Sequence, residues 1–309
     1  MFNAHYDTVG VEGMTEPFSG AIREGKLYGR GAYDMKGSLA AQITAAKALI
    51  DTGVQLNGDL LIAAVADEEY ASIGVQSVIA AYPKIDAVIV TEPSELEISL
   101  AHKGFIWLEV ITQGRAYHGS RPDLGIDANM HMGRFLQRLE SLGAAVLQQR
   151  PHPLLGPPSL HAATLRGGTE LSVYAAECRL GIERRTLPGE TEQAVTAQIQ
   201  PLLNELSAAD PTFNATLQTI LVRDPFEVDA SAPIVQTLTA VGAEVLGDPP
   251  PHIGQMFWTD AAFHAATGSD TVLIGPKGHG LHSAEEWVDV ESVIQLTEIL
   301  ARTAASYLR

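Results

Sequence analysis

The chain has 309 residues, of which 46% are hydrophobic, and its formal net charge at pH 7 is −17. An acidic chain without a cluster of lysines and arginines disfavours negatively charged partners, so we expect it to bind neither nucleic acid nor an anionic membrane surface. No apolar run approaches the length of a membrane span, and the first ten residues lack the pattern of a secretory signal. A single cysteine, Cys178, excludes an internal disulfide framework and fits the reducing cytoplasm, which is the location we expect.

The first hundred residues predict helices that alternate with buried strands. Helix formers fill residues 37–53, and a continuous apolar run at 59–66 predicts a buried strand. A second helix is predicted over 72–82, and a second strand with its exit loop over 86–94. Strands separated by helices usually pair in parallel. This part of the chain therefore predicts an α/β fold, with a mostly parallel sheet and helices on both faces.

Residues 104–224 predict a different architecture, in which the elements follow the order β-α-β-β-α-β. That order is typical of a small antiparallel sheet covered by two helices, an α+β arrangement of the ferredoxin-like kind. The strands are expected at 105–115, 160–168, 171–183 and 215–223, and the helices at 128–147 and 190–207.

The α/β pattern resumes at residue 225. Helices are predicted at 232–246, 259–266 and 289–308, around a strand at 271–276. We therefore expect one discontinuous domain, formed by residues 1–103 and 225–309, with residues 104–224 inserted as a second domain.

Acidic and histidine side chains follow several of the predicted strands. The consecutive acids Asp67, Glu68 and Glu69 end the strand at 59–66, Glu92 ends the next strand, and His282 follows the last one. Because parallel strands end at the same edge of a sheet, we expect these side chains to lie close together. Neighbouring acids repel one another, and a bound cation would relieve that repulsion. Carboxylates and imidazoles together predict a metal site.

Each of these stretches also has an ordinary explanation when taken alone. The pairing of His5 with Asp7 occurs often by chance, and Asp34 precedes a predicted helix and fits a capping residue. Glu69 and Glu92 fit solvated loops. The metal interpretation is favoured because all of these stretches fall at one predicted edge.

A series of short motifs then identifies a family resemblance. Taken in order, they resemble those of the dinuclear zinc amidohydrolases, which include acetylornithine deacetylase, succinyl-diaminopimelate desuccinylase, aminoacylase and carboxypeptidase-G-like enzymes. Each motif is weak alone, but their order is specific and covers essentially the whole chain. The motifs are "HYDTV", "LYGRGAYDMKGSLAA", "ADEEYASIG", "TEPS", "GRAYHGSRPDLGIDAN", "RRTLPGET", "TDAAFH" and "GLHSAEEWVDV".

The resemblance implies two zinc ions per chain, with cobalt or manganese as alternatives. One ion would be held by His5 and Glu92, the other by Glu69 and His282, and Asp34 would bridge both. It further implies that Asp7 fixes the imidazole of His5. Glu68 would be the general base, taking a proton from the metal-bridged water and passing it to the leaving amine.

For the inserted domain the resemblance implies a lid and a homodimer contact. His118 would reach the site of the neighbouring subunit and stabilise the oxyanion, although a plain surface role stays open. Arg185 would anchor a substrate carboxylate, since its planar fork can bind both oxygens. Arg184 should face the opposite side of the strand. Ser172 stands where the family often has a substrate-binding asparagine.

The expected function is hydrolysis of the amide bond of an N-acyl amino acid, as in acetylornithine deacetylase. A carboxypeptidase or dipeptidase acting through the same site is the alternative within this chemistry. A different alternative is a truncated relative that binds metal without turnover, because family members usually have several tens of residues before the first motif. A strand missing there would leave an exposed sheet edge. The complete ligand set and Glu68 favour the enzyme.

Overall fold

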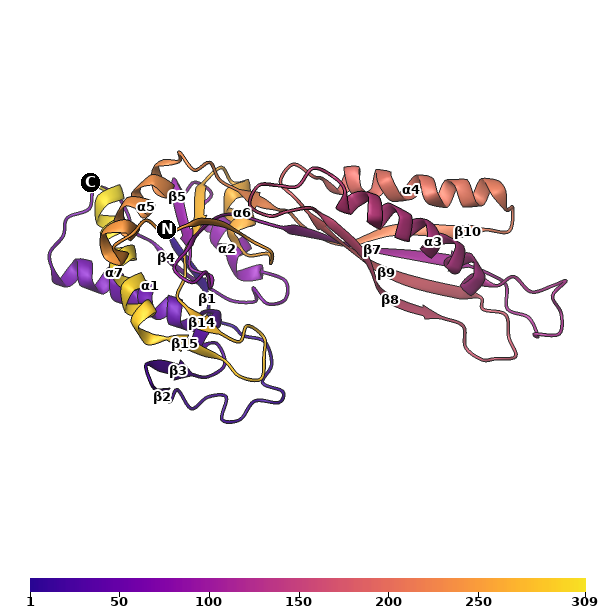
Figure 1. Cartoon of the computed structure of the whole chain (residues 1–309), viewed down its shortest axis with the longest axis horizontal. Helices are drawn as coiled ribbons and strands as arrows, with labels where there is room; N and C mark the ends of the chain where they lie inside the picture. The colour runs from indigo at the N-terminus through magenta and orange to yellow at the C-terminus, as the bar shows by residue number, and fades with distance from the viewer. The chain divides into compact units, whose positions relative to one another are not determined.

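The computed structural model describes residues 1–309, which form two compact units. One unit comprises Met1–Ala101, Phe226–Gln255 and Thr259–Arg309. The other comprises His102–Pro225 and Met256–Trp258. Figure 1 shows that the first unit is built from both ends of the chain, while the second contains the middle. None of the helices combines the length and the hydrophobicity that a membrane-spanning segment requires.

A seven-stranded sheet forms the centre of the first unit, in the order β11-β6-β13-β5-β1-β4, with β12 paired to β6. The neighbours β4, β1, β5 and β13 are all parallel, and β13 pairs with β6 in the antiparallel sense. The sheet is therefore mostly parallel, as the sequence predicts. The strands are β1 (Phe2–His5), β4 (Ile62–Val65), β5 (Ala87–Val90), β6 (Ile98–His102), β11 (Phe226–Glu227), β12 (His252–Gln255) and β13 (Asp270–Leu273).

Helices cover both faces of this sheet, which confirms the predicted α/β fold class. The helix α1 packs against α7, and α7 packs against α5, whereas α2 contacts α6 (Figure 1). A short turn, η1 (Ala32–Lys36), in which Asp34 and Met35 have non-helical backbone dihedrals, leads directly into α1 and carries Asp34. The helices are α1 (Gly37–Asp51), α2 (Ile73–Ala81), α5 (Pro233–Leu246), α6 (Ala261–Ala266) and α7 (Val290–Tyr307).

A small antiparallel sheet in the first unit was not predicted from the sequence. Its order is β14-β15-β3-β2, so it joins an early segment of the chain to a late one. Each strand has only two or three residues, too few to show an alternating pattern. The strands are β2 (Ile22–Arg23), β3 (Lys26–Tyr28), β14 (Gly278–His279) and β15 (Trp287–Asp289).

The second unit has the predicted α+β architecture. Its antiparallel sheet has the order β10-β7-β9-β8, and Figure 1 shows α3 and α4 on the same face of it. Asp127 caps α3 by accepting from the backbone N–H groups of Asn129 and Met130, and Thr191 caps α4. The elements are β7 (Gly104–Gln113), α3 (Ala128–Leu147), β8 (Ser159–Gly167), β9 (Glu177–Thr186), α4 (Glu192–Ala209) and β10 (Asn214–Arg223).

Side chains alternate between the two faces of the sheet along the strands of the second unit, and this alternation determines which of them are buried. In β9, Cys178, Leu180 and Ile182 point into the core beneath the helices. Arg184 lies on this buried face, whereas Arg185 lies on the other, half-buried face. Cys178 is therefore a packing residue, as the sequence predicts.

Candidate metal centre

Three of the predicted side chains meet beyond the carboxyl ends of β1 and β5. His5 is the last residue of β1, Glu92 lies two residues after β5, and Asp34 comes from η1. His5 Nε2 is 3.0 Å from Asp34 Oδ1 and 3.8 Å from Glu92 Oε1. One ligand atom from each of these residues lies within 4.8 Å of the other two. The three side chains could therefore hold one metal ion.

A second group of three donors contains Asp34 again, together with Glu69 and His282. His282 Nε2 lies 3.3 Å from Asp34 Oδ2 and 3.1 Å from Glu69 Oε2. The two oxygens of Asp34 thus face different groups. One carboxylate placed in this way can serve two ions, which are about 3.5–4 Å apart in two-metal hydrolytic sites.

The donor chemistry and burial of the two groups fit metal ions. Imidazole nitrogens and carboxylate oxygens are ligands for zinc, and they also accept cobalt or manganese. The His5 side chain is 1% exposed, whereas that of His282 is 54% exposed. The first group is therefore closed and the second is open to solvent. If each group held one ion, its three protein donors would leave further coordination positions for water and substrate.

Asp7 links the two groups through the backbone. His5 Nδ1 donates to the backbone oxygen of Asp7 at 3.1 Å and lies 3.6 Å from its carboxylate. This leaves Nε2 of His5 facing Asp34. The other carboxylate oxygen of Asp7 accepts from the backbone N–H of Glu69 at 3.2 Å. Such contacts orient metal-binding imidazoles in proteins.

The loops that carry these donors contain residues in left-handed backbone conformations. Asp67 has a φ of 71° and Ser72 one of 57°, on either side of Glu68 and Glu69. His282 itself has a φ of 56°. Non-glycine residues adopt this region at an energetic cost and concentrate at functional sites.

The two imidazoles are held in a strongly negative environment. Burial opposes the charge of His5, but hydrogen bonds with Asp34 and Asp7 outweigh it and raise its pKa to about 12. Hydrogen bonds with Asp34 and Glu69 raise the pKa of His282 to about 10. A cation bound here would replace these protons and take over the same partners.

Two buried carboxyl groups of this cluster, those of Glu68 and Glu92, resist ionisation, whereas the burial of Asp34 is outweighed by hydrogen bonds with His282 and His5, which lower its pKa to about 2. Burial raises the pKa of Glu92 to about 8. Burial, together with the charges of Glu92 and Asp260, raises the pKa of Glu68 well above its usual range. Perturbed carboxylates that gather at one edge of a sheet are typical of functional sites.

Asp260 is a member of this environment to which the sequence assigned no role. It is 1% exposed and immediately precedes α6. Its charge raises the pKa values of both Glu68 and Glu92. The motif "TDAAFH" contains this aspartate, so the signal was present in the sequence.

His118, Arg185 and Ser172 lie in the second unit and belong to neither donor group. His118 is exposed, and its Nδ1 is 2.8 Å from the hydroxyl of Ser120. Arg185 donates to Glu183 at 2.7 Å and lies 5.2 Å from the ring centre of Phe105. Ser172 is exposed. Arg184 is buried and paired with Glu190, which excludes it as a free anchor for a substrate.

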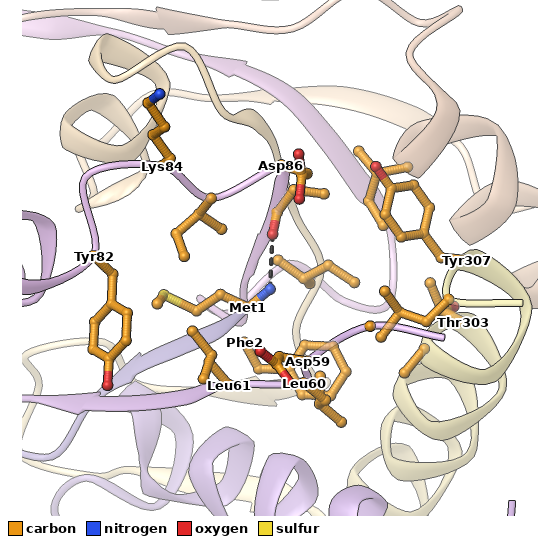
Figure 2. Close-up of a pocket in the computed structure, with 17 residues that line it drawn as sticks. Met1, Phe2, Asp59, Leu60, Leu61, Tyr82, Lys84, Asp86, Thr303 and Tyr307 are labelled. Carbon is orange, nitrogen blue, oxygen red and sulfur yellow. Dashed lines mark hydrogen bonds between the residues drawn. The ribbon is translucent and has the colours of Figure 1, made fainter. Parts of the chain in front are cut away.

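A separate cavity of about 300 Å³ lies at the opposite end of β1. Figure 2 shows Tyr82, Asp86 and Tyr307 around it, together with the amino group of Met1, which donates to the backbone oxygen of Ala87 at 2.7 Å. His5 stands at the other end of the strand, so this cavity is not part of the metal centre.

Comparisons with known proteins agree with the geometry. Acetylornithine deacetylase of Myxococcus xanthus is 31% identical over 289 residues, which are 92% of this chain and 73% of that protein. A Bacillus subtilis (strain 168) protein, N-formyl-4-amino-5-aminomethyl-2-methylpyrimidine deformylase, is 28% identical over 97% of this chain and 77% of its own length. The structure of the Bacillus subtilis YXEP protein, a dinuclear metal binding peptidase, superposes with a TM-score of 0.76 at 16% identity, covering 99% of this chain and 80% of that one.

The sequence profile of peptidase family M20/M25/M40 matches residues 1–306, nearly the whole chain. With that match and the relative of 31% identity, the chain belongs to peptidase family M20/M25/M40 and is a metal-dependent hydrolase of amide bonds.

Proposed function

We propose that the protein removes the acyl group from an N-acyl amino acid, with two divalent metal ions held by His5, Asp34, Glu69, Glu92 and His282. The observation that carries the proposal is the pair of donor groups that share Asp34. The similarity to an acetylornithine deacetylase supports the choice of substrate class. Zinc is the proposed metal, because nitrogen and carboxylate ligands in sets of three suit it well.

The chemistry requires water to attack the amide carbon and the C–N bond to break. When bound, the metal ions supply Lewis acidity toward the carbonyl oxygen and lower the pKa of water. Glu68 takes a proton from the attacking water and delivers it to the departing amine nitrogen. Its raised pKa suits this exchange, because a general base works best when its pKa lies near the operating pH. The products are a carboxylate and a free amine.

Arg185 is the proposed anchor for the carboxylate of the amino acid. Its Nε and Nη2 already donate to the two carboxylate oxygens of Glu183, at 2.7 and 3.4 Å. A substrate carboxylate would bind Nη1, the nitrogen not bonded to Glu183, and would compete with Glu183 for Nη2 to use the planar fork of the guanidinium. Ser172 is proposed to contribute a hydroxyl to the same substrate.

We further propose a homodimer formed through the second unit. The strand β8 is an edge of its sheet, and its residues from His161 to Gly167 are exposed. Edge strands readily pair with another chain. In such a dimer His118 would stabilise the oxyanion in the partner's site. Sedimentation that shows only monomer would remove this role for His118.

The function is tested by incubating the zinc-loaded protein with a panel of N-acetyl, N-formyl and N-succinyl amino acids and of dipeptides. Release of free amine from the N-acyl amino acids is the expected result. Turnover confined to dipeptides would identify a peptidase instead. No turnover of any compound by a protein that holds its metal would indicate a relative that binds metal without catalysis.

A further inference from the structure

A buried ion pair lies beside the loop that carries Asp34. Arg30 Nη1 donates to Glu286 Oε2 at 2.7 Å, and the side chains of Arg30 and Glu286 are 4% and 0% exposed. Removing one partner from a buried pair leaves an uncompensated charge, which is costly. We therefore expect the ion pair between Arg30 and Glu286 to stay intact in the folded protein.

The carboxylate of Glu286 binds the backbone of the Asp34 loop directly. Its Oε1 accepts from the backbone N–H groups of Tyr33 and Asp34, at 2.9 and 3.0 Å. Its Oε2 accepts from the backbone N–H of Gly31 at 3.0 Å, besides Arg30. These N–H groups belong to a turn without a regular hydrogen-bond ladder, so the carboxylate supplies the acceptors that the backbone needs.

Arg30 extends the same contact to two other segments. Its Nε donates to the backbone oxygen of Gly10 at 3.0 Å, and its Nη2 donates to that of Ser283 at 2.8 Å. Ser283 directly follows His282. The buried pair thus ties the Asp34 loop to the His282 loop, and the facing atoms of Asp34 and His282 are 3.3 Å apart.

We propose that Glu286 is a positioning residue for the metal centre, which fixes the carboxylate of Asp34 between its two groups of donors. The inference rests on the proposed two-metal function. Glu286 is not itself a metal ligand, because its two oxygens already accept four hydrogen bonds. Its effect reaches the metal through the backbone of Asp34.

The test compares Glu286→Gln with Glu285→Gln. Each carboxylate oxygen of Glu286 accepts two hydrogen bonds. Glutamine replaces one of these oxygens by an NH₂ group, which is a donor and cannot accept from the two N–H groups that face it. Glu285 is the exposed neighbour, so the same change there should leave metal binding untouched. Metal affinity is measured on metal-free protein by competition with a chelator, and the absorption spectrum of the cobalt form reports the ligand geometry.

We expect Glu286→Gln to lower metal affinity about 10–100-fold, the range found for residues that orient ligands, and to change the cobalt spectrum. A folded Glu286→Gln protein with unchanged affinity and spectrum would overturn the inference while leaving the proposed function standing. If the parent protein itself bound no metal, the proposed function and the inference about Glu286 would both be wrong. If Glu286→Gln does not fold, Arg30→Lys is the second test. Lysine keeps the positive charge but lacks the planar set of guanidinium donors. The same drop in metal affinity is expected for this variant.

Discussion

The Glu68→Gln variant is expected to lose about 10²–10⁴-fold in kcat, the usual contribution of a positioned general base. Glutamine cannot take a proton from the attacking water, whereas the proposed ligands remain. Metal content should therefore equal that of the parent protein. The measurement pairs steady-state kinetics on the best substrate of the panel with elemental analysis of the same sample.

Asp67 provides a matched control for this change. It precedes Glu68 in the same loop and is in neither donor group. Asp67→Asn makes the same carboxyl-to-amide change, and asparagine tolerates the left-handed backbone at this position. Its kcat should stay close to that of the parent. Full activity in Glu68→Gln would show that another group moves the proton.

Asp34→Ala is expected to abolish binding of both metal ions and, with it, activity. Asp34 is the one residue common to both donor groups. Losing it leaves two donors in each, and neither pair can hold an ion tightly. Glu92→Ala and Glu69→Ala each remove a donor from one group only, so each of these variants should retain one ion. Elemental analysis after zinc loading and desalting distinguishes the loss of both ions in Asp34→Ala from the retention of one ion in the other two variants.

Asp51→Ala is the control, because this aspartate is exposed at the end of α1. It should bind metal as the parent does. Circular dichroism on the metal-free proteins shows whether Asp34→Ala is folded. Two ions retained in folded Asp34→Ala would rule out a shared carboxylate.

Much of the fold follows from simple patterns. The apolar runs of β4 and β5, separated by the helix former stretch of α2, predict parallel strands, and the structure has them. The β-α-β-β-α-β order predicts the second unit equally well. The strands β6 and β12 and the small sheet of β2, β3, β14 and β15 were missed. They are short, and the small sheet is closed by the pairing of β3 with β15, whose residues lie more than two hundred positions apart in the sequence.

The proximity of the donor side chains was predictable in part. The ends of parallel strands place His5, Glu69 and Glu92 at one edge. The individual roles of these residues came from the resemblance to a family and stay predictions. The shared position of Asp34 depends on η1, which no periodicity indicates.

Glu286 illustrates what a sequence cannot reveal. It follows another glutamate, and nothing in the pair distinguishes the buried residue from the exposed one. Only the tertiary structure shows that the backbone N–H groups around Asp34 need an acceptor and that Glu286 supplies it. The ion pair between Arg185 and Glu183, by contrast, is of a kind that a sequence can predict, because residues two apart in a strand share a face.

The central claim is that this chain holds two metal ions through one shared aspartate. Its most direct test is the metal content of the purified protein, measured by elemental mass spectrometry after zinc loading and desalting. The two donor groups predict about two ions per chain. A content of one ion or none in the folded protein would contradict the claim.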